Sequence, residues 1–159
     1  MKTVTVNQLK KELQELSPKD LAELCLKLAK YKKDNKEFLG YLVFESHDNT
    51  SFITDVKELM DAHFGELQSQ SNLYYIKKSL RKLLRIINKY CKYIGDKALA
   101  AELHIYFCLK VKEAGIRIHK NQQLENMYNQ ELKKINTLIS SLHEDLRHDY
   151  AGDLKKIII

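Results

Sequence analysis

The residues of this chain best suited to a chemical task are seven cations in one segment. Residues 67–95 hold seven basic side chains and no acidic one. Phosphate groups are bound by several cations that project the same way, and tyrosines beside them can stack on unpaired bases. The segment therefore predicts a binding surface for an anionic partner, formed by Lys77, Lys78, Arg81, Lys82, Arg85, Lys89 and Lys92.

The excess charge of the whole chain is concentrated in this segment. The formal net charge is +6, yet residues 1–66 carry ten basic and twelve acidic side chains, and residues 96–159 carry ten and nine. Such concentration raises the expectation of nucleic acid, an acidic protein surface or anionic lipid as partner. A lysine-rich helix face is also the ordinary exterior of a helical bundle. Nucleic acid is therefore the alternative partner, and a membrane surface ranks lower because the apolar face of this segment is expected to pack inside the bundle.

One histidine cluster has a composition that suggests a metal site. His143, Glu144 and His148 lie close together, with Arg147 between them. The two histidines are five residues apart, roughly 140° around a helix, so the HExxH zinc geometry is absent. A solvated helix face is the expected structure here, and we predict no metal and no cofactor.

The three cysteines do not form a recognisable redox or catalytic motif. Cys25, Cys91 and Cys108 are an odd number, lack CxxC spacing and each lie in an apolar helical pattern. A nucleophilic cysteine would require a base nearby in space, and no cysteine active-site motif supplies one. We expect three core thiols in a reducing cytosol, and we predict that the chain is not an enzyme.

The elements that position these residues are expected to be helices. Of the 159 residues, 44% are apolar, one is proline and five are glycine. This composition lacks the residues that tight turns and sheet edges require. The sequence predicts an all-α protein with a continuous core.

Capping residues and apolar periodicity define the expected helices. Thr5 with Gln8 starts the first helix, and Ser17 followed by Pro18 starts the second. A glycine at position 152 predicts a frayed terminal turn. The expected ranges are about 5–16, 17–31, 34–45, 51–67, 73–94 and 97–114, and a long helix from 121 that ends near 140 or continues through 154.

Three of these segments carry expectations about the core. The second helix has a core-facing apolar stripe, and residues 38–44 are apolar on too many sides for an exposed helix. Residues 97–114 are apolar over so wide an arc that they predict the central, most buried helix. The stripe of the second helix consists of Leu21, Leu24, Cys25, Leu28 and Tyr31.

Short connections between the helices predict antiparallel neighbours. No repeat with a period near that of helical-repeat arrays is present. We therefore expect an irregular bundle or right-handed stack of six to eight antiparallel helices, in a single domain that spans residues 1–159.

The N-terminal run VNQLKKELQELSPKDLAELCLKLAKYKKDNKEFLGYLV resembles the opening of a family of uncharacterised all-helical bacterial domains. In that family an LKKEL helix precedes a Ser/Asp-led helix of alternating Leu and acidic residues, and a KEFL-type helix follows. The resemblance covers about the first 45 residues. It implies a bacterial helical domain without assigned chemistry, and it brings no site residues with it.

Helical stacks bind partner chains through ridges and grooves and need no special residues for it. The sequence therefore predicts a non-catalytic protein–protein interaction module with an unknown protein partner, and a homo-oligomer is compatible with this function. The alternative is a nucleic-acid-binding protein that uses the basic face of helix 73–94. The sequence has no run of about 20 apolar residues and no signal-peptide core, so we expect no membrane span and a cytoplasmic location.

Overall fold

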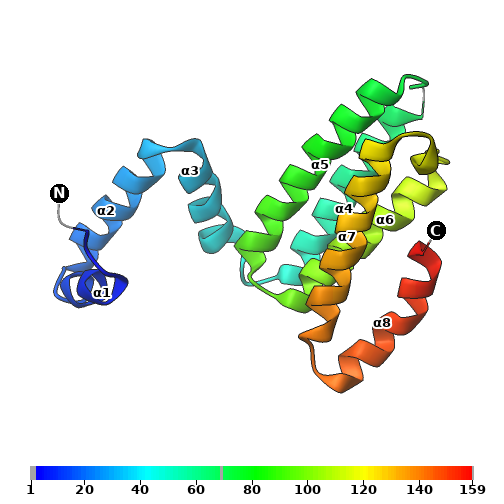
Figure 1. Cartoon of the computed structure of the whole chain (residues 1–159). Helices are drawn as coiled ribbons and strands as arrows, with labels where there is room; N and C mark the ends of the chain where they lie inside the picture. Colours follow the sequence, from blue (N-terminus) through cyan, green and yellow to red (C-terminus); the bar gives the residue numbers. More distant parts are fainter. Residues whose placement is uncertain (1–2, 69, 159) are drawn as a thin grey trace. The chain divides into compact units, whose positions relative to one another are not determined.

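The computed structural model describes residues 3–68 and 70–158, and it is almost entirely helical (Figure 1). Eight α-helices and two short helical turns account for 84% of the described residues, among which no strand occurs. The predicted all-α class and number of helices are confirmed. Contacts divide the chain into two compact units, Met1–His47 (unit 1) and Asp48–Ile159 (unit 2). Each unit is described by itself, and the single-domain organisation of residues 1–159 stays a prediction.

Unit 1 consists of three α-helices and a π-helical turn. The side chains of Thr5 and Gln8 each accept a hydrogen bond from the other's backbone N–H, which starts the first helix as predicted. Ser17 Oγ accepts from the Asp20 amide at 3.2 Å, and Pro18 occupies the first position of the second helix. The elements are α1 (Val6–Gln14), α2 (Pro18–Tyr31), α3 (Lys33–Gly40) and η1 (Tyr41–Glu45).

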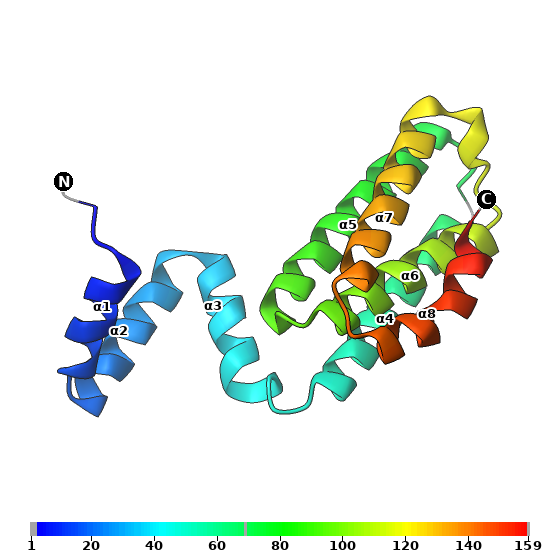
Figure 2. The ribbon, with the colours of Figure 1, turned by 60° about the horizontal axis from the view of Figure 1, so that its bottom comes forward.

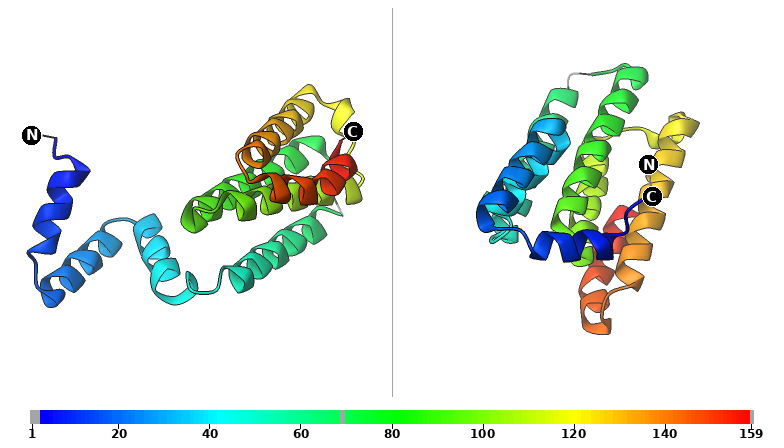
Figure 3. Two further views of the ribbon diagram at one scale, coloured as in Figure 1. Left: turned by 90° about the horizontal axis from the view of Figure 1, so that it is seen from below. Right: turned by 90° about the vertical axis from the view of Figure 1, so that its left-hand side faces the viewer.

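The helices of unit 1 do not build a core of their own. Tyr41 is the sole buried side chain among the described residues of this unit. We expected the apolar stripe of the second helix and residues 38–44 to face a core, and within unit 1 this expectation is wrong. The left-hand view of Figure 3 shows α2 and α3 as successive helices joined at a sharp bend, which occurs at Lys32. A pair of short helices has too few neighbours to cover both of its apolar faces.

Unit 2 is a bundle in which successive helices run in opposite directions (Figures 1 and 2). Gly95 and Gly115 adopt φ values of 68° and 63°, the left-handed conformation that ends α5 and α6. The elements are α4 (Asn49–Leu67), α5 (Leu73–Ile94), α6 (Lys97–Glu113), η2 (Ile118–Lys120), α7 (Gln122–Ser140) and α8 (Glu144–Ile157).

The central helix of unit 2 is α6, as its wide apolar arc predicts. It packs against α4, α5, α7 and α8. Phe107, Leu103 and Ala101 are fully buried. Asp96 starts this helix by accepting hydrogen bonds from the amides of Ala98 and Leu99.

Two alternatives were predicted for the long helix from residue 121, an end near 140 or continuation through 154, and the structure has the first. The long helix ends at Ser140, and a separate helix, α8, runs to Ile157 without fraying at Gly152. Ile157 is fully buried, and its carbonyl accepts a hydrogen bond from the Tyr128 hydroxyl at 2.7 Å. The predicted frayed turn is wrong because this packing and hydrogen bond hold the end of α8 in place.

Candidate functional site

The seven cations predicted to bind an anionic partner lie along one side of α5. They fall within an arc of roughly 140° around the helix axis, opposite the buried apolar side chains of the same helix. Lys77 and Lys89 are partly buried. The structure thus brings all seven to one face, which we call the basic face. Its exposed members are Lys78, Arg81, Lys82, Arg85 and Lys92.

Neighbouring side chains hold the two partly buried cations. Lys77 Nζ donates a hydrogen bond to Gln123 Oε1 of α7 at 2.5 Å and lies 5.8 Å from the centre of the Tyr74 ring. Lys89 Nζ lies 5.3 Å from the centre of the Tyr90 ring. Cations beside aromatic rings offer both charge and a stacking surface to a nucleotide chain.

Two hollows border the basic face. One of about 600 Å³ lies between α5 and α7, and one of about 350 Å³ lies between α4 and α5. Arg85 lines both of them. In the larger hollow, amide side chains stand opposite the cations, and they can both donate and accept hydrogen bonds. These amides belong to Asn88, Gln123, Asn126 and Gln130.

A third hollow, of about 350 Å³, lies within unit 1 between α2 and α3. Asn35 Nδ2 donates a hydrogen bond to the Leu28 carbonyl oxygen at 2.9 Å and so ties the two helices together. Apart from Asn35, the lining is apolar or a thiol. It consists of Cys25, Leu28, Ala29, Asn35, Phe38, Leu39 and Leu42.

Unit 1 exposes large apolar side chains on all of its helices. Leu28 is 53% exposed, Tyr31 77% and Phe44 73%. Sequence reasoning missed this surface because periodicity shows which face of a helix is apolar and not what covers it. We call the set the unit 1 apolar surface. It comprises Val6, Leu9, Leu16, Leu24, Leu26, Leu28, Tyr31, Phe38, Leu42, Val43 and Phe44.

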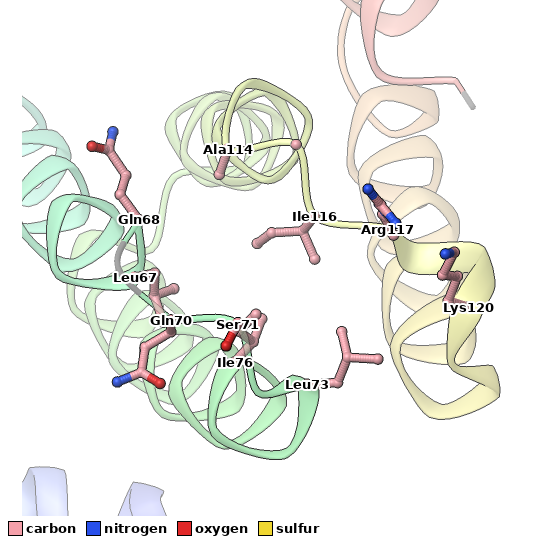
Figure 4. Close-up of a pocket in the computed structure, with 11 residues that line it drawn as sticks. Leu67, Gln68, Gln70, Ser71, Leu73, Ile76, Ala114, Ile116, Arg117 and Lys120 are labelled. Carbon is pink, nitrogen blue, oxygen red and sulfur yellow. The ribbon is translucent and has the colours of Figure 1, made fainter.

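A fourth hollow, of about 420 Å³, lies where the α4–α5 and α6–α7 connections approach each other. Ile116 points into it, and Arg117 and Lys120 lie at its η2 side (Figure 4). The side chains that line it include cations and amides but no carboxylate, thiol or histidine. Its lining therefore offers no carboxylate–histidine or thiol–histidine pair.

Three helices of unit 2 bring together a thiol, an imidazole and a carboxylate. Cys91 Sγ of α5 lies 3.8 Å from His104 Nε2 of α6, and His104 Nδ1 lies 2.6 Å from Glu131 Oε2 of α7. The His104 side chain is 0% exposed and that of Glu131 is 10% exposed. We call these residues the thiol–imidazole–carboxylate cluster. They are far apart in sequence, so spacing gives no signal for it.

The neighbours of His104 determine where its ring carries the proton. Nδ1 lies beside the Glu131 carboxylate, whose negative charge favours a proton on that nitrogen, although the two atoms form no hydrogen bond of acceptable geometry. Nε2 then presents a lone pair to the Cys91 thiol. This arrangement lets the imidazole accept the thiol proton.

The cysteines differ from the expected three core thiols. Cys108 is buried, Cys91 is partly buried and Cys25 is exposed. Burial raises the pKa of the Cys91 thiol to about 11, although the positive charge of Lys134 opposes this change. Burial likewise raises the pKa of Cys108 to about 12. At neutral pH both groups are therefore thiols and not thiolates.

A second histidine, His63 of α4, contacts a serine of α5. Its Nε2 lies 2.6 Å from Ser79 Oγ and 3.3 Å from the Ser79 carbonyl oxygen. A hydroxyl both donates and accepts, so the shorter contact fits a hydrogen on either Nε2 or Oγ. His63 ties α4 to α5 through this contact.

The histidine-rich segment near the C-terminus places its side chains in solvent. His143 Nδ1 lies 3.3 Å from Asp145 Oδ2, with both side chains exposed. Across residues 3–68 and 70–158, no group of three histidine, cysteine or acidic side chains is arranged to hold a metal ion. None of the helices described is both long and apolar enough to cross a membrane.

No protein-family model, curated protein or solved structure matches this chain.

Proposed function

We propose that this chain is a non-catalytic protein–protein interaction module that binds a helical partner through the unit 1 apolar surface. The observation that supports this proposal is that two segments of unit 1 have the apolar periodicity of core helices but leave most of their apolar side chains exposed. The second helix and residues 38–44 have the apolar patterns of core elements, yet all their large apolar side chains except Leu21, Leu39 and Tyr41 stay exposed in unit 1. Covering one large apolar side chain is worth about 1.5–3 kcal/mol, so a partner that covers several of them gains substantial binding free energy.

The groove between α2 and α3 suggests the chemistry of that partner. Leu28, Phe38 and Leu42 give the groove an apolar floor, onto which an amphipathic helix can lay residues spaced three and four apart. Residues 27–36 around the groove contain five lysines and one aspartate. We therefore expect a partner helix whose polar face is acidic. The three free cysteines are compatible with a reducing compartment such as the cytoplasm.

This function is tested by comparing the partners that the purified full chain captures with those that the variants Leu28→Asp and Phe44→Asp capture. Each variant places a charge on the unit 1 apolar surface, and its exposed position should leave the fold intact by circular dichroism. We expect both variants to lose the partner that the natural chain retains. The Arg81→Glu, Arg85→Glu double variant serves as the control and should keep it.

Protection of Cys25 gives a second readout on the same complex. Cys25 lines the α2–α3 groove and is exposed in the free chain. A maleimide should modify it more slowly once the partner is bound. Capture that persists in both charged variants, with Cys25 still fully reactive in the complex, would refute the proposal.

A second candidate function is the binding of nucleic acid to the basic face. It is supported by seven cations on one helix face and by the amide side chains across the larger hollow. Arginine and lysine bind phosphates, while amides bind base edges or sugars. We expect binding that is independent of sequence, micromolar or weaker near physiological salt, and steeply salt-dependent.

Titration of a fluorescent oligonucleotide at several salt concentrations tests this second function. The Arg81→Glu, Arg85→Glu double variant should abolish binding and keep its helix content. The matched control is Lys155→Glu with Lys156→Glu, which removes the same number of cations from the last turn of α8. Binding that both double variants weaken equally would show only general charge attraction and would count against a site on α5.

A further inference from the structure

The thiol–imidazole–carboxylate cluster of unit 2 serves neither of the functions proposed above. Burying an imidazole and a carboxylate costs free energy that apolar side chains of similar size would not. His104 Nδ1 lies 2.6 Å from Glu131 Oε2, His104 Nε2 lies 3.8 Å from Cys91 Sγ, and the three residues belong to different helices. A thiol next to a base is typical of an activated nucleophile. We infer that Cys91 is a site of covalent modification by small α,β-unsaturated carbonyl compounds.

The Cys91 side chain is partly exposed, and the larger hollow lies one helical turn away, at Asn88. Cys91 is partly buried, whereas His104 behind it is fully buried. Glu131 and Asn88 line the hollow between α5 and α7, and Asn88 lies one turn before Cys91. Lys134 Nζ donates a hydrogen bond to Asn88 Oδ1 and so places a positive charge at this end of the hollow.

The arrangement of the three groups supports a balanced addition reaction. The Cys91 thiol proton moves to His104 Nε2 while Sγ forms a bond to the β-carbon of the electrophile. The carbon–carbon π bond breaks, and its electron pair moves toward the carbonyl oxygen, where the Lys134 charge stabilises it. His104 then returns the proton to the α-carbon, so no other reactant is needed. Glu131 stabilises the imidazolium between these two proton transfers.

The thiol depends on the imidazole because its own ionisation is suppressed. Burial raises the pKa of Cys91 to about 11. The titratable or charged groups that act on the thiol are His104 of α6 and Glu131 and Lys134 of α7. In the neutral range, only proton transfer to His104 therefore produces the nucleophile at an appreciable rate.

The pH dependence of acrylamide addition to the natural full chain tests the inference without any substitution. Peptide mass spectrometry gives the rate at each cysteine. Cys25 is exposed, and because the thiolate is the nucleophile, its rate should rise steeply with pH. The rate at Cys91 should rise much less steeply, because its thiol transfers its proton to His104 and does not ionise into solvent. Parallel rises at the two sites, or no addition at Cys91 in the folded chain, would overturn the inference.

Substitution of His104, the proposed base, provides the second part of the test. His104→Gln should slow addition at Cys91 by roughly tenfold or more and leave the rate at Cys25 unchanged. The control is His63→Gln, because His63 is another histidine of unit 2, partly buried, and contacts Ser79. If His104→Gln modifies Cys91 as fast as the natural chain or faster, the cluster is purely structural. The pH profile of the natural chain decides the question if this variant does not fold.

Discussion

Glu131 shows at the scale of single residues what a buried charge requires. Its carboxylate lies 2.6 Å from His104 Nδ1, close enough for an ion pair, and neither atom has a hydrogen-bonding partner among the described residues. Removing one member of such a pair leaves the other group buried with no opposite charge beside it. Each residue of the pair therefore depends on the other far more than an exposed ion pair would.

We predict that Glu131→Ala lowers the free energy of unfolding by about 3 kcal/mol. The matched control is Glu125→Ala, also on α7, whose carboxylate lies 3.3 Å from the ring of an exposed histidine, His119. That change should cost about 0.5 kcal/mol or less. Urea denaturation followed by circular dichroism measures both values, and equal losses would show that the buried pair contributes no more than a surface pair.

Single residues also show where prediction from the sequence succeeds and where it stops. The seven cations were predictable because their positions relative to one another depend only on the geometry of one helix. His104 lies 13 residues after Cys91 and 27 before Glu131, so their meeting depends on how three helices pack. The periodicity of one segment contains no information about that packing. The prediction that Cys25 is a core thiol was wrong for a related reason. An apolar pattern shows that one face of a helix is apolar, but it does not show whether another helix packs against that face.

At the scale of the element, the start of α6 depends on one carboxylate. Asp96 Oδ1 accepts hydrogen bonds from the amides of Ala98 at 2.7 Å and Leu99 at 3.0 Å. We predict that Asp96→Ala costs about 1 kcal/mol of unfolding free energy, since two amides lose their partner. Asp96→Asn retains an acceptor oxygen and should lose much less. Thermal denaturation distinguishes the two variants, and equal losses would contradict the role of the cap.

A polar contact between α4 and α6 makes stability depend on pH. Burial raises the pKa of Asp61, but hydrogen bonds from Lys110 and Tyr106 outweigh it and hold that pKa below its usual value. A carboxylate whose pKa is lowered on folding stabilises the folded state above its unfolded pKa, near 3.9, and loses that contribution as the pH falls through the folded value.

We therefore predict that Asp61→Asn lowers the stability of the chain at pH 7, and that the difference from the natural chain shrinks as the pH falls toward about pH 3. Asp55→Asn, an exposed position on α4, is the control and should change stability little at either pH. Urea midpoints at the two pH values provide the measurement. A difference that grows on acidification would contradict the direction of this pKa change.

Most of the helices could be predicted from local signals, because caps and periodicity act over a few residues. Helix α5 begins and ends at the predicted residues, Leu73 and Ile94. The end of α8 could not be predicted, because the hydrogen bond from Tyr128 to Ile157 joins residues 29 positions apart. Glycine 152 alone suggests fraying, and a tertiary contact overrides it.

At the scale of the whole molecule, the two units differ in how much they bury. The described part of unit 1 has one buried side chain, whereas α6 alone has eight. Local opening is easiest where few apolar contacts must be broken. We predict that amides of α1 and α2 exchange with solvent at least about a hundredfold faster than those of α6 in the free chain. Hydrogen–deuterium exchange with mass spectrometry measures this, and equal protection would show that the unit 1 apolar surface is covered in the free chain.

Composition predicted the fold class of the whole molecule but not its division into units. Low glycine and proline contents restrict the chain to helices. They do not determine how many helices share one core, because leucines of α2 and of α5 follow the same periodicity. The difference between them is that the α5 leucines meet α6, while Leu26 and Leu28 stay in solvent.

The exposed side chains of α2 and η1 also bear on how the chain survives in a cell. Chaperones and proteases act on proteins that display uncovered apolar helices. If a partner covers Phe44 and Tyr31 as proposed, the chain is expected to be degraded faster when that partner is scarce. Its abundance should then follow that of the partner, so that depleting one lowers the level of the other without any change in transcription.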